Sequence, residues 1–286
     1  MEFMEKSATV ARRSLTPAAL ALALGLRAAR QERRVGLREM AGQLGLDPAS
    51  VCTMELGTRN ARIENVMRIL GFLRVNGEEY RRMVAIARVA AEPNWLEVGP
   101  VEYPALLMEY ERTASGIVTW APSVFPDLVQ TPEYARAVLD TGMLTGDEIE
   151  QGVMIRLVRP DVLCGEKPTA CTVLLGDAVL RNRFGGSVVM REQVRRVLDM
   201  VEANQVSVRI VPAADDGQAS VPDPFAVYEF VDRAPIVGVG QDCLRAYLTE
   251  ESQVDRYRAA QDRLSARVLG EEDSRALLTD VLTRLG

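Results

Sequence analysis

The stretch from Val35 to Arg59 constrains the fold of this chain more than any other segment. Apolar residues recur at helical spacing over Leu37–Leu44, and Gly45 permits a tight turn directly after them. The Asp47-Pro48 pair predicts the start of a second helix, because aspartate accepts hydrogen bonds from the first free amides and proline suits the first helical position. Gly57 predicts its end. Two short helices joined by such a turn are typical of a helix-turn-helix, which presents its second helix to the DNA major groove.

Further helical periodicity surrounds this motif. Residues 17–33 predict a long helix with Leu20, Leu24 and Ala28 on one apolar face. Residues 63–73 and 77–91 predict two more helices, whose inward-facing side chains would be Ile63, Val66, Met67, Leu70, Leu73, Tyr80, Met83, Val84 and Ala87. Five helices between residues 17 and 92 therefore predict a compact all-α domain, preceded by a flexible tail over residues 1–16.

The charge distribution divides the chain in the same place. Residues 1–92 contain 15 basic and 10 acidic residues, a net charge of +5, whereas residues 93–286 contain 19 basic and 30 acidic residues, a net charge of −11. A basic first module suits contact with phosphate groups, and an acidic remainder would be repelled by them. The total length of 286 residues corresponds to about two domains.

The absence of histidine limits the chemistry that this chain can perform. It removes Ser-His and Cys-His nucleophile systems and the commonest zinc ligand. Gly185-Gly186 lies in no phosphate-binding pattern, so we expect no cofactor, no metal site and no catalytic residue. Catalysis by carboxylates, by Lys6 or Lys167, by tyrosines or by cysteines remains open. The four cysteines form no CxxC pair, which favours reduced packing residues at Cys52, Cys164, Cys171 and Cys243.

No segment has the composition of a membrane span. The apolar runs are shorter than the roughly 18 residues that a spanning helix needs, and the first residues lack the basic and apolar pattern of a secretory signal. We therefore expect a cytoplasmic protein that does not enter a membrane.

The second half of the chain predicts helices and strands in mixed order. Pro93, Gly99, Pro100 and Pro104 interrupt the helical pattern and predict a linker over residues 93–104. After it, helical spacing predicts helices over residues 108–114, 129–139, 147–158, 189–203, 250–269 with Thr249 as its cap, and 274–285, whereas β-branched and apolar runs predict strands over residues 172–175, 206–211, 225–231 and 236–239. The predicted fold is mostly α, with an α+β domain over residues 105–286 that has a small sheet flanked by helices.

Residues 24–73 resemble the XRE family of lambda-repressor-like helix-turn-helix proteins. The resemblance rests on Met40-Ala41, Leu44-Gly45, the small Ser50 and the ending Glu55-x-Gly57. It implies a five-helix domain that works as a homodimer on a two-fold DNA site. The implied base-reading residues are Pro48, Ala49, Ser50 and Thr53, and the implied phosphate contacts are Arg33, Arg34, Arg38, Arg59, Asn60 and Arg62.

The four implied base-reading positions differ from the XRE family pattern. None of them is Arg, Lys, Asn or Gln, and Arg34 stands where a glycine commonly ends the first helix. Two interpretations follow. The motif binds DNA mainly through phosphate contacts, or it is kept only as a structural or dimerising unit.

Residues 125–136, FPDLVQTPEYAR, resemble the segment that opens a domain of unknown function attached to XRE modules in actinobacterial regulators, some of them antitoxin-like. Residues 178–181, 185–186, 189–190 and 206–212 match later segments in the same order. The resemblance implies a transcription regulator whose second domain senses a small-molecule ligand or docks a small acidic partner protein.

A candidate pocket in this second domain comprises Asp127, Gln130, Tyr134 and Asp223. Asp127 and Asp223 stand where the resembled segments have glycine, which leaves a second hypothesis open: a regulator-like scaffold recruited as an enzyme or small-molecule binder in specialised metabolism. Asp215, Asp216 and Asp223 form an acidic loop without the interleaved spacing of a calcium loop, which favours a solvated turn.

Overall fold

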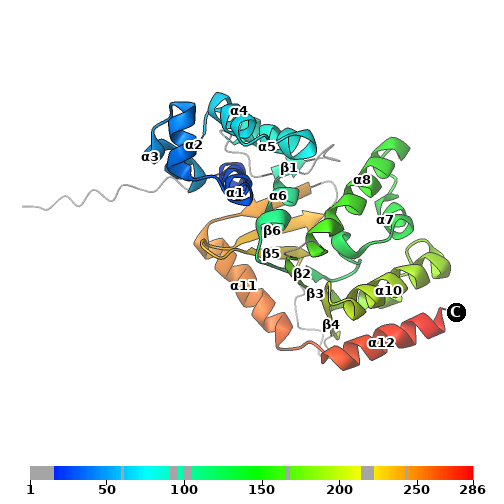
Figure 1. The fold of residues 1–286 in the computed structure, drawn as a ribbon. Helices are drawn as coiled ribbons and strands as arrows, with labels where there is room; N and C mark the ends of the chain where they lie inside the picture. The colour runs from blue at the N-terminus through cyan, green and yellow to red at the C-terminus, as the bar shows by residue number, and fades with distance from the viewer. Residues whose placement is uncertain are drawn as a thin grey trace, which may run out of the picture.

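The computed structural model shows a bundle of helices packed against a mixed sheet (Figure 1). It describes residues 16–58, 61–90, 96–98, 105–164, 168–213, 222–241 and 244–285. Within these ranges it contains twelve α-helices, two short 3₁₀ helices and seven strands. The fold is mostly α with an α+β part, as predicted. No described helix is long and apolar enough to cross a bilayer.

Five helices form the N-terminal region, and the predicted bounds of its two short helices are confirmed. The helices are α1 (Pro17–Glu32), α2 (Leu37–Leu44), α3 (Pro48–Glu55), α4 (Ile63–Phe72) and α5 (Gly77–Val89). Gly45 and Gly57 adopt left-handed φ angles of 61° and 70°, which allow the chain to turn after α2 and α3. The Asp47 side chain accepts a hydrogen bond from the amide of Ser50, as expected for a cap.

Helix α1 is more deeply buried than its sequence predicts. Leu20 and Ala28, two of the three residues of the predicted face, are only half-buried, whereas Ala18, Ala21 and Ala29 are fully buried. The reason is that α1 contacts α3, α4 and α5 of its own region and also contacts α6 (Ala105–Thr113) of the second region. One hydrophobic cluster therefore continues from residues of α1 through α6 to the sheet.

The C-terminal region contains the expected helices with small shifts of their ends. After α6, the expected helices are α7 (Pro132–Leu139), α8 (Gly146–Val158), α10 (Gly186–Glu202), α11 (Glu251–Ser265) and α12 (Glu271–Arg284). The short helix α9 (Ala178–Arg181) and the 3₁₀ helices η1 (Asp127–Val129) and η2 (Arg159–Leu163) are not among the predicted elements. The predicted cap Thr249 is wrong, because Glu250 occupies the N-cap position of α11, where its side chain makes no capping hydrogen bond. Gly270 is the residue that precedes α12.

The sheet has more strands than the sequence predicts. The expected strands are β3 (Ala170–Gly176), β4 (Ser207–Val211), β5 (Phe225–Glu229) and β6 (Ile236–Gln241), and the unexpected ones are β1 (Leu96–Val98), β2 (Gly116–Ala121) and β7 (Leu244–Leu248). The strand order is β1-β7-β6-β5-β2-β3-β4. Strands β2, β3 and β4 are parallel, and the other neighbours are antiparallel. Part of the predicted linker is thus a strand at one edge of the sheet.

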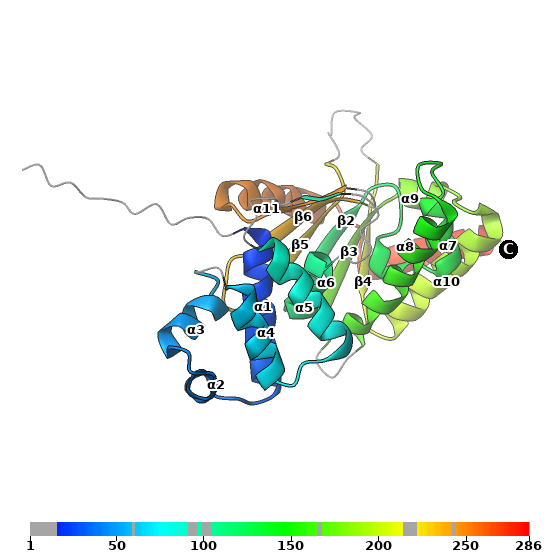
Figure 2. The same ribbon diagram turned by 90° about the horizontal axis from the view of Figure 1, so that it is seen from above.

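Different elements pack on the two faces of the sheet. On one face, Trp120, Phe225 and Val237 pack against Val254 and Leu264 of α11. On the other face lie α6 and, beyond it, the N-terminal helices (Figures 1 and 2). Residues of η1 and η2 border a cavity on this face. Helix α12 packs on α10 and on β4. The amide of Leu269 donates to the Ile210 carbonyl, and the Ser274 hydroxyl accepts from the Ile210 amide, so the chain covers its own β4 edge.

The close approach of α1 to α5 and α6 requires glycine at position 25. A methyl group there would lie 2.7 Å from Met83 Cε and 2.8 Å from Glu109 Oε1. We expect Gly25→Ala to lower the free energy of unfolding by about 1–3 kcal/mol, the usual effect of overpacking. Gly71→Ala in α4 is the matched control, because nothing lies within 4 Å of its added methyl group. It should stabilise the protein by about 0.5–1 kcal/mol through helix propensity. Urea unfolding measures both, and equal effects would contradict the prediction.

Candidate functional site

The first candidate site is the outer surface of α2 and α3. Figure 2 shows these two helices at the opposite side of the molecule from α7, α9 and α10. Pro48, Ala49 and Arg38 are exposed, while Ser50, Cys52 and Thr53 are half-buried. The predicted reading residues therefore form one face that remains accessible to a large partner.

A buried ion pair holds α3 on α1. Glu55, only 3% exposed, accepts from Arg30 through both carboxylate oxygens, at 2.7 Å each. Arg30 also donates to the Val35 carbonyl at 2.9 Å. Two parallel bonds between a guanidinium and a carboxylate fix orientation as well as distance. The Glu55-x-Gly57 ending thus anchors the second helix of the motif.

The hydroxyl groups of the reading face are engaged within the helix itself. The Ser50 hydroxyl donates to Asp47 Oδ2 at 3.1 Å, and the Thr53 hydroxyl donates to the Ser50 carbonyl at 2.8 Å. The hydroxyl oxygens of Ser50 and Thr53 can still accept hydrogen bonds, and Ala49 presents a methyl group. The outer face of α3 is therefore uncharged apart from its cap.

The predicted phosphate contacts fall into three groups. Arg34, Arg38 and Arg62 are exposed, and Arg34 has a φ of 54°, the left-handed conformation that glycine would favour. Arg33 instead donates to Glu79 at 2.9 Å and to the Ala29 carbonyl, so its guanidinium packs on the helices. Arg59 and Asn60 lie outside the described residues.

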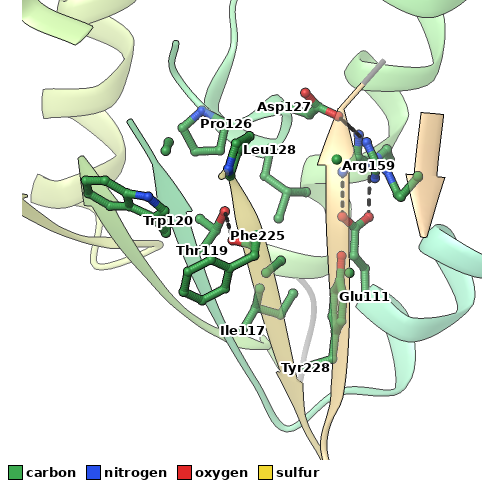
Figure 3. A pocket seen from close by; sticks show the side chains of 16 residues that line it. Glu111, Ile117, Thr119, Trp120, Pro126, Asp127, Leu128, Arg159, Phe225 and Tyr228 are labelled. Carbon is green, nitrogen blue, oxygen red and sulfur yellow. Dashed lines mark hydrogen bonds and ion pairs between the residues drawn. The ribbon is translucent and has the colours of Figure 1, made fainter. Parts of the chain in front are cut away.

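The second candidate site is a cavity of about 60 Å³ between the sheet and the segments η1 and η2 (Figure 3). This volume holds roughly four water molecules. Its floor is hollow because neighbouring strands place small residues side by side: Thr119 pairs with Ala226, and Ala226 pairs with Gly238. Leu128 and Pro126 of the η1 turn lie over this floor, and Tyr228 borders it.

One wall of the cavity is built from ion pairs. Arg159 donates to both oxygens of Glu111, at 3.0 and 2.5 Å, and to Asp127 at 2.8 Å. Arg245 donates to the same Asp127 oxygen at 3.2 Å, and Arg156 lies 3.5 Å from the other oxygen. Asp127 therefore links η1 to α8, η2 and β7.

These contacts fix the protonation states in the cavity. Burial alone would raise the pKa of Asp127, but the charges of Arg156, Arg159 and Arg245 outweigh burial and hold this pKa well below its usual range. Burial, together with the nearby Glu111 carboxylate, raises the pKa of Tyr228 far above neutrality. The same two causes raise the pKa of the Cys171 thiol to about 12. Cys171 lies on β3 and is not among the residues that line the cavity. At neutral pH the lining groups Asp127 and Tyr228 are a carboxylate and a phenol, an arrangement suited to binding and poorly suited to proton transfer.

The predicted pocket residues are only partly brought together. Asp127 lines the cavity. Gln130 donates to the Phe125 carbonyl at 2.6 Å, and the Tyr134 hydroxyl accepts from the Phe125 amide at 3.2 Å, so both hold the turn that carries Asp127. Asp223 is exposed, next to the lining residue Pro224.

Sequence reasoning missed the rest of this wall. Glu111, Arg159 and Arg245 come from distant segments, and no local spacing relates them. Asp215, Asp216, Trp95 and Cys243 lie outside the described residues. Within the described part of the chain, no group of three or more His, Cys, Asp or Glu side chains could hold a metal ion.

Comparison with known families identifies the second region. Residues 104–280 match the model of a family described as a domain of unknown function, DUF5753. The match covers more than half of the chain, so the protein belongs to this family. It begins just before α6 and includes the whole ion-paired wall of the cavity. No curated protein and no solved structure matches the chain.

The ion pairs of Asp127 predict a dependence of stability on pH. Its pKa is lower in the folded protein than in the unfolded chain, so its contribution is present above about pH 4 and is lost as the pH falls towards the folded pKa. Asp127→Asn should lower the free energy of unfolding at pH 7 by about 3 kcal/mol, because three arginines each lose one charged partner. Its stability should then fall less steeply than that of the wild type below about pH 4.

Chemical denaturation at several pH values measures this difference. Asp199→Asn, which alters an exposed carboxylate on α10, serves as the control and should change stability by less than about 0.5 kcal/mol. Parallel pH curves for wild type and Asp127→Asn would contradict the prediction.

Proposed function

We propose that this protein is a DNA-binding transcription regulator of the XRE, lambda-repressor-like type. The observation that carries the proposal is the accessible α2–α3 unit, which the Arg30–Glu55 pair holds rigidly on α1. The net charge of +5 over residues 1–92 supports contact with phosphates. Such a regulator acts in the cytoplasm, as a homodimer on a two-fold DNA site.

The uncharged reading face favours phosphate contacts over strong base recognition. Ser50 and Thr53 use their hydroxyl hydrogens within the helix, whereas Arg34, Arg38 and Arg62 are exposed around it. Affinity would then come mostly from counterion release, and sequence preference from acceptor oxygens and the Ala49 methyl group.

The second part of the proposal assigns the cavity of the DUF5753 domain to a small-molecule ligand. It combines a hollow floor, an aromatic border and fixed charges of both signs, and its volume of about 60 Å³ would suit a ligand of only a few non-hydrogen atoms. A small acidic partner protein that docks on this domain is the other effector that the family resemblance suggests.

A second candidate function is a small-molecule binder that does not use DNA. Two observations favour it: the outer face of α3 carries no basic side chain, and Asp127 lies in the cavity. Catalysis by carboxylate acid–base chemistry fits this scaffold poorly, because Asp127 and Glu111 are both ion-paired.

DNA binding is tested by fluorescence anisotropy with genomic fragments over a range of salt concentrations. Arg38→Ala should weaken binding to all sequences alike and reduce the slope of log affinity against log salt by about 0.9. Ser50→Ala and Thr53→Ala should instead change the preference among sequences.

The matched control is Arg256→Ala on α11, an exposed arginine remote from α2, which should leave binding unchanged. Failure to bind any fragment at low salt would exclude the regulator and leave the small-molecule binder. An equal loss in Arg38→Ala and Arg256→Ala would show that α2 is not the contact surface.

A further inference from the structure

Three consecutive residues of α6 face three different parts of the molecule. Glu109 contacts the N-terminal helices, Tyr110 lies between α1 and the sheet, and Glu111 belongs to the wall of the cavity. Helix α6 therefore contacts α1 and α5 of the N-terminal region and also lines the cavity.

Glu109 connects α6 to α5 through a buried ion pair and to α1 through Arg112 and the exposed Glu32. It is fully buried and accepts from Arg82 of α5 and from Arg112, both at 2.8 Å. Arg112 in turn donates to Glu32 of α1 at 2.8 Å. A buried carboxylate between two guanidiniums tolerates little displacement, because a lost partner leaves an uncompensated charge.

Tyr110 makes the second connection to the N-terminal helices. Its hydroxyl donates to the carbonyl of Pro17, the first residue of α1, at 2.5 Å. Its ring centroid lies 5.2 Å from that of Tyr247 and 5.9 Å from that of Tyr228. Tyr228 borders the cavity, so one side chain contacts both the cavity wall and the start of α1.

The Glu111 carboxylate is bound by a residue of the cavity wall. Its carboxylate takes both bonds from Arg159, and its backbone carbonyl accepts from the Thr169 hydroxyl at 3.4 Å. Arg159 also binds Asp127 on the η1 turn. A ligand that enters beneath η1 must therefore meet groups whose contacts position the end of α6.

We propose that α6 couples the cavity to the helix-turn-helix, so that a change in the Glu111–Arg159 pair alters how firmly α1 and α5 are held. The proposal rests on the proposed function and specifies how its ligand site regulates the DNA-binding surface. The connection runs from Glu111 along α6 to Tyr110 and Glu109, then to α1, and through Arg30–Glu55 to α3. Packed helices move as rigid units, which lets adjacent residues of α6 transmit one displacement.

Hydrogen exchange of the full chain tests this coupling without a ligand or DNA. Glu111→Gln keeps the size of the side chain and removes its charge. We expect amides of α1 and α5 to exchange roughly fivefold faster or more, while amides of β3 and β4 stay protected. Glu150→Gln is the matched control: it breaks a two-bond pair with Arg136 on the surface of the same domain and should leave α1 and α5 unchanged.

Faster exchange confined to α6, η2 and the strands would overturn the proposal, as would equal effects of Glu111→Gln and Glu150→Gln. If Glu111→Gln does not fold, Arg245→Gln perturbs the same wall through Asp127 and should act on α1 and α5 in the same direction. No change in α1 and α5 in that variant would likewise overturn the proposal. Hydrogen exchange is measured here without DNA. Failure of the coupling and failure of the proposed DNA binding can therefore be told apart.

Discussion

The burial of α1 on two sides is the constraint on which the rest of the structure depends. One side packs on α3, α4 and α5, and the other packs on α6. Alanine and glycine along α1 let both neighbours approach, because small side chains leave room for a second layer. The α2–α3 unit is consequently built on the same helix that meets the second region. Its orientation relative to the sheet is fixed by packing and charge, not by a linker alone.

Charged side chains have a different role at the cavity. Around Asp127, charges are paired at the edge of a small hollow, where burial would otherwise oppose ionisation. Such an arrangement keeps the turn η1 in place while leaving polar groups near the cavity. It explains why a domain that lacks histidine can still present an ordered polar site. It also separates recognition, which this wall can provide, from proton transfer, which its fixed protonation states disfavour.

The sequence predicts local structure better than it predicts the site. Caps and glycines fix α2 and α3 to the residue, because their signals lie within a few positions of each helix end. Strand β2 was missed, since its sequence GIVTWA is buried on both faces and lacks the alternation of a half-exposed strand. Asp127 was found through a family resemblance. Glu111, Arg159 and Arg245 meet only after three distant segments fold together, and pairwise spacing cannot reveal such a cluster.

The covered edge of β4 bears on how two copies of this chain could associate. An open edge strand is a template on which another chain can add a strand. Here the Ile210 carbonyl accepts from the amide of Leu269, in the segment that joins α11 and α12, and the Ile210 amide donates to the Ser274 hydroxyl in the first turn of α12. An incoming strand would first have to displace both groups. Pairing of copies through a continuous sheet at β4 is thereby disfavoured. A sheet shared between two copies would therefore have to form at the opposite edge, which is β1.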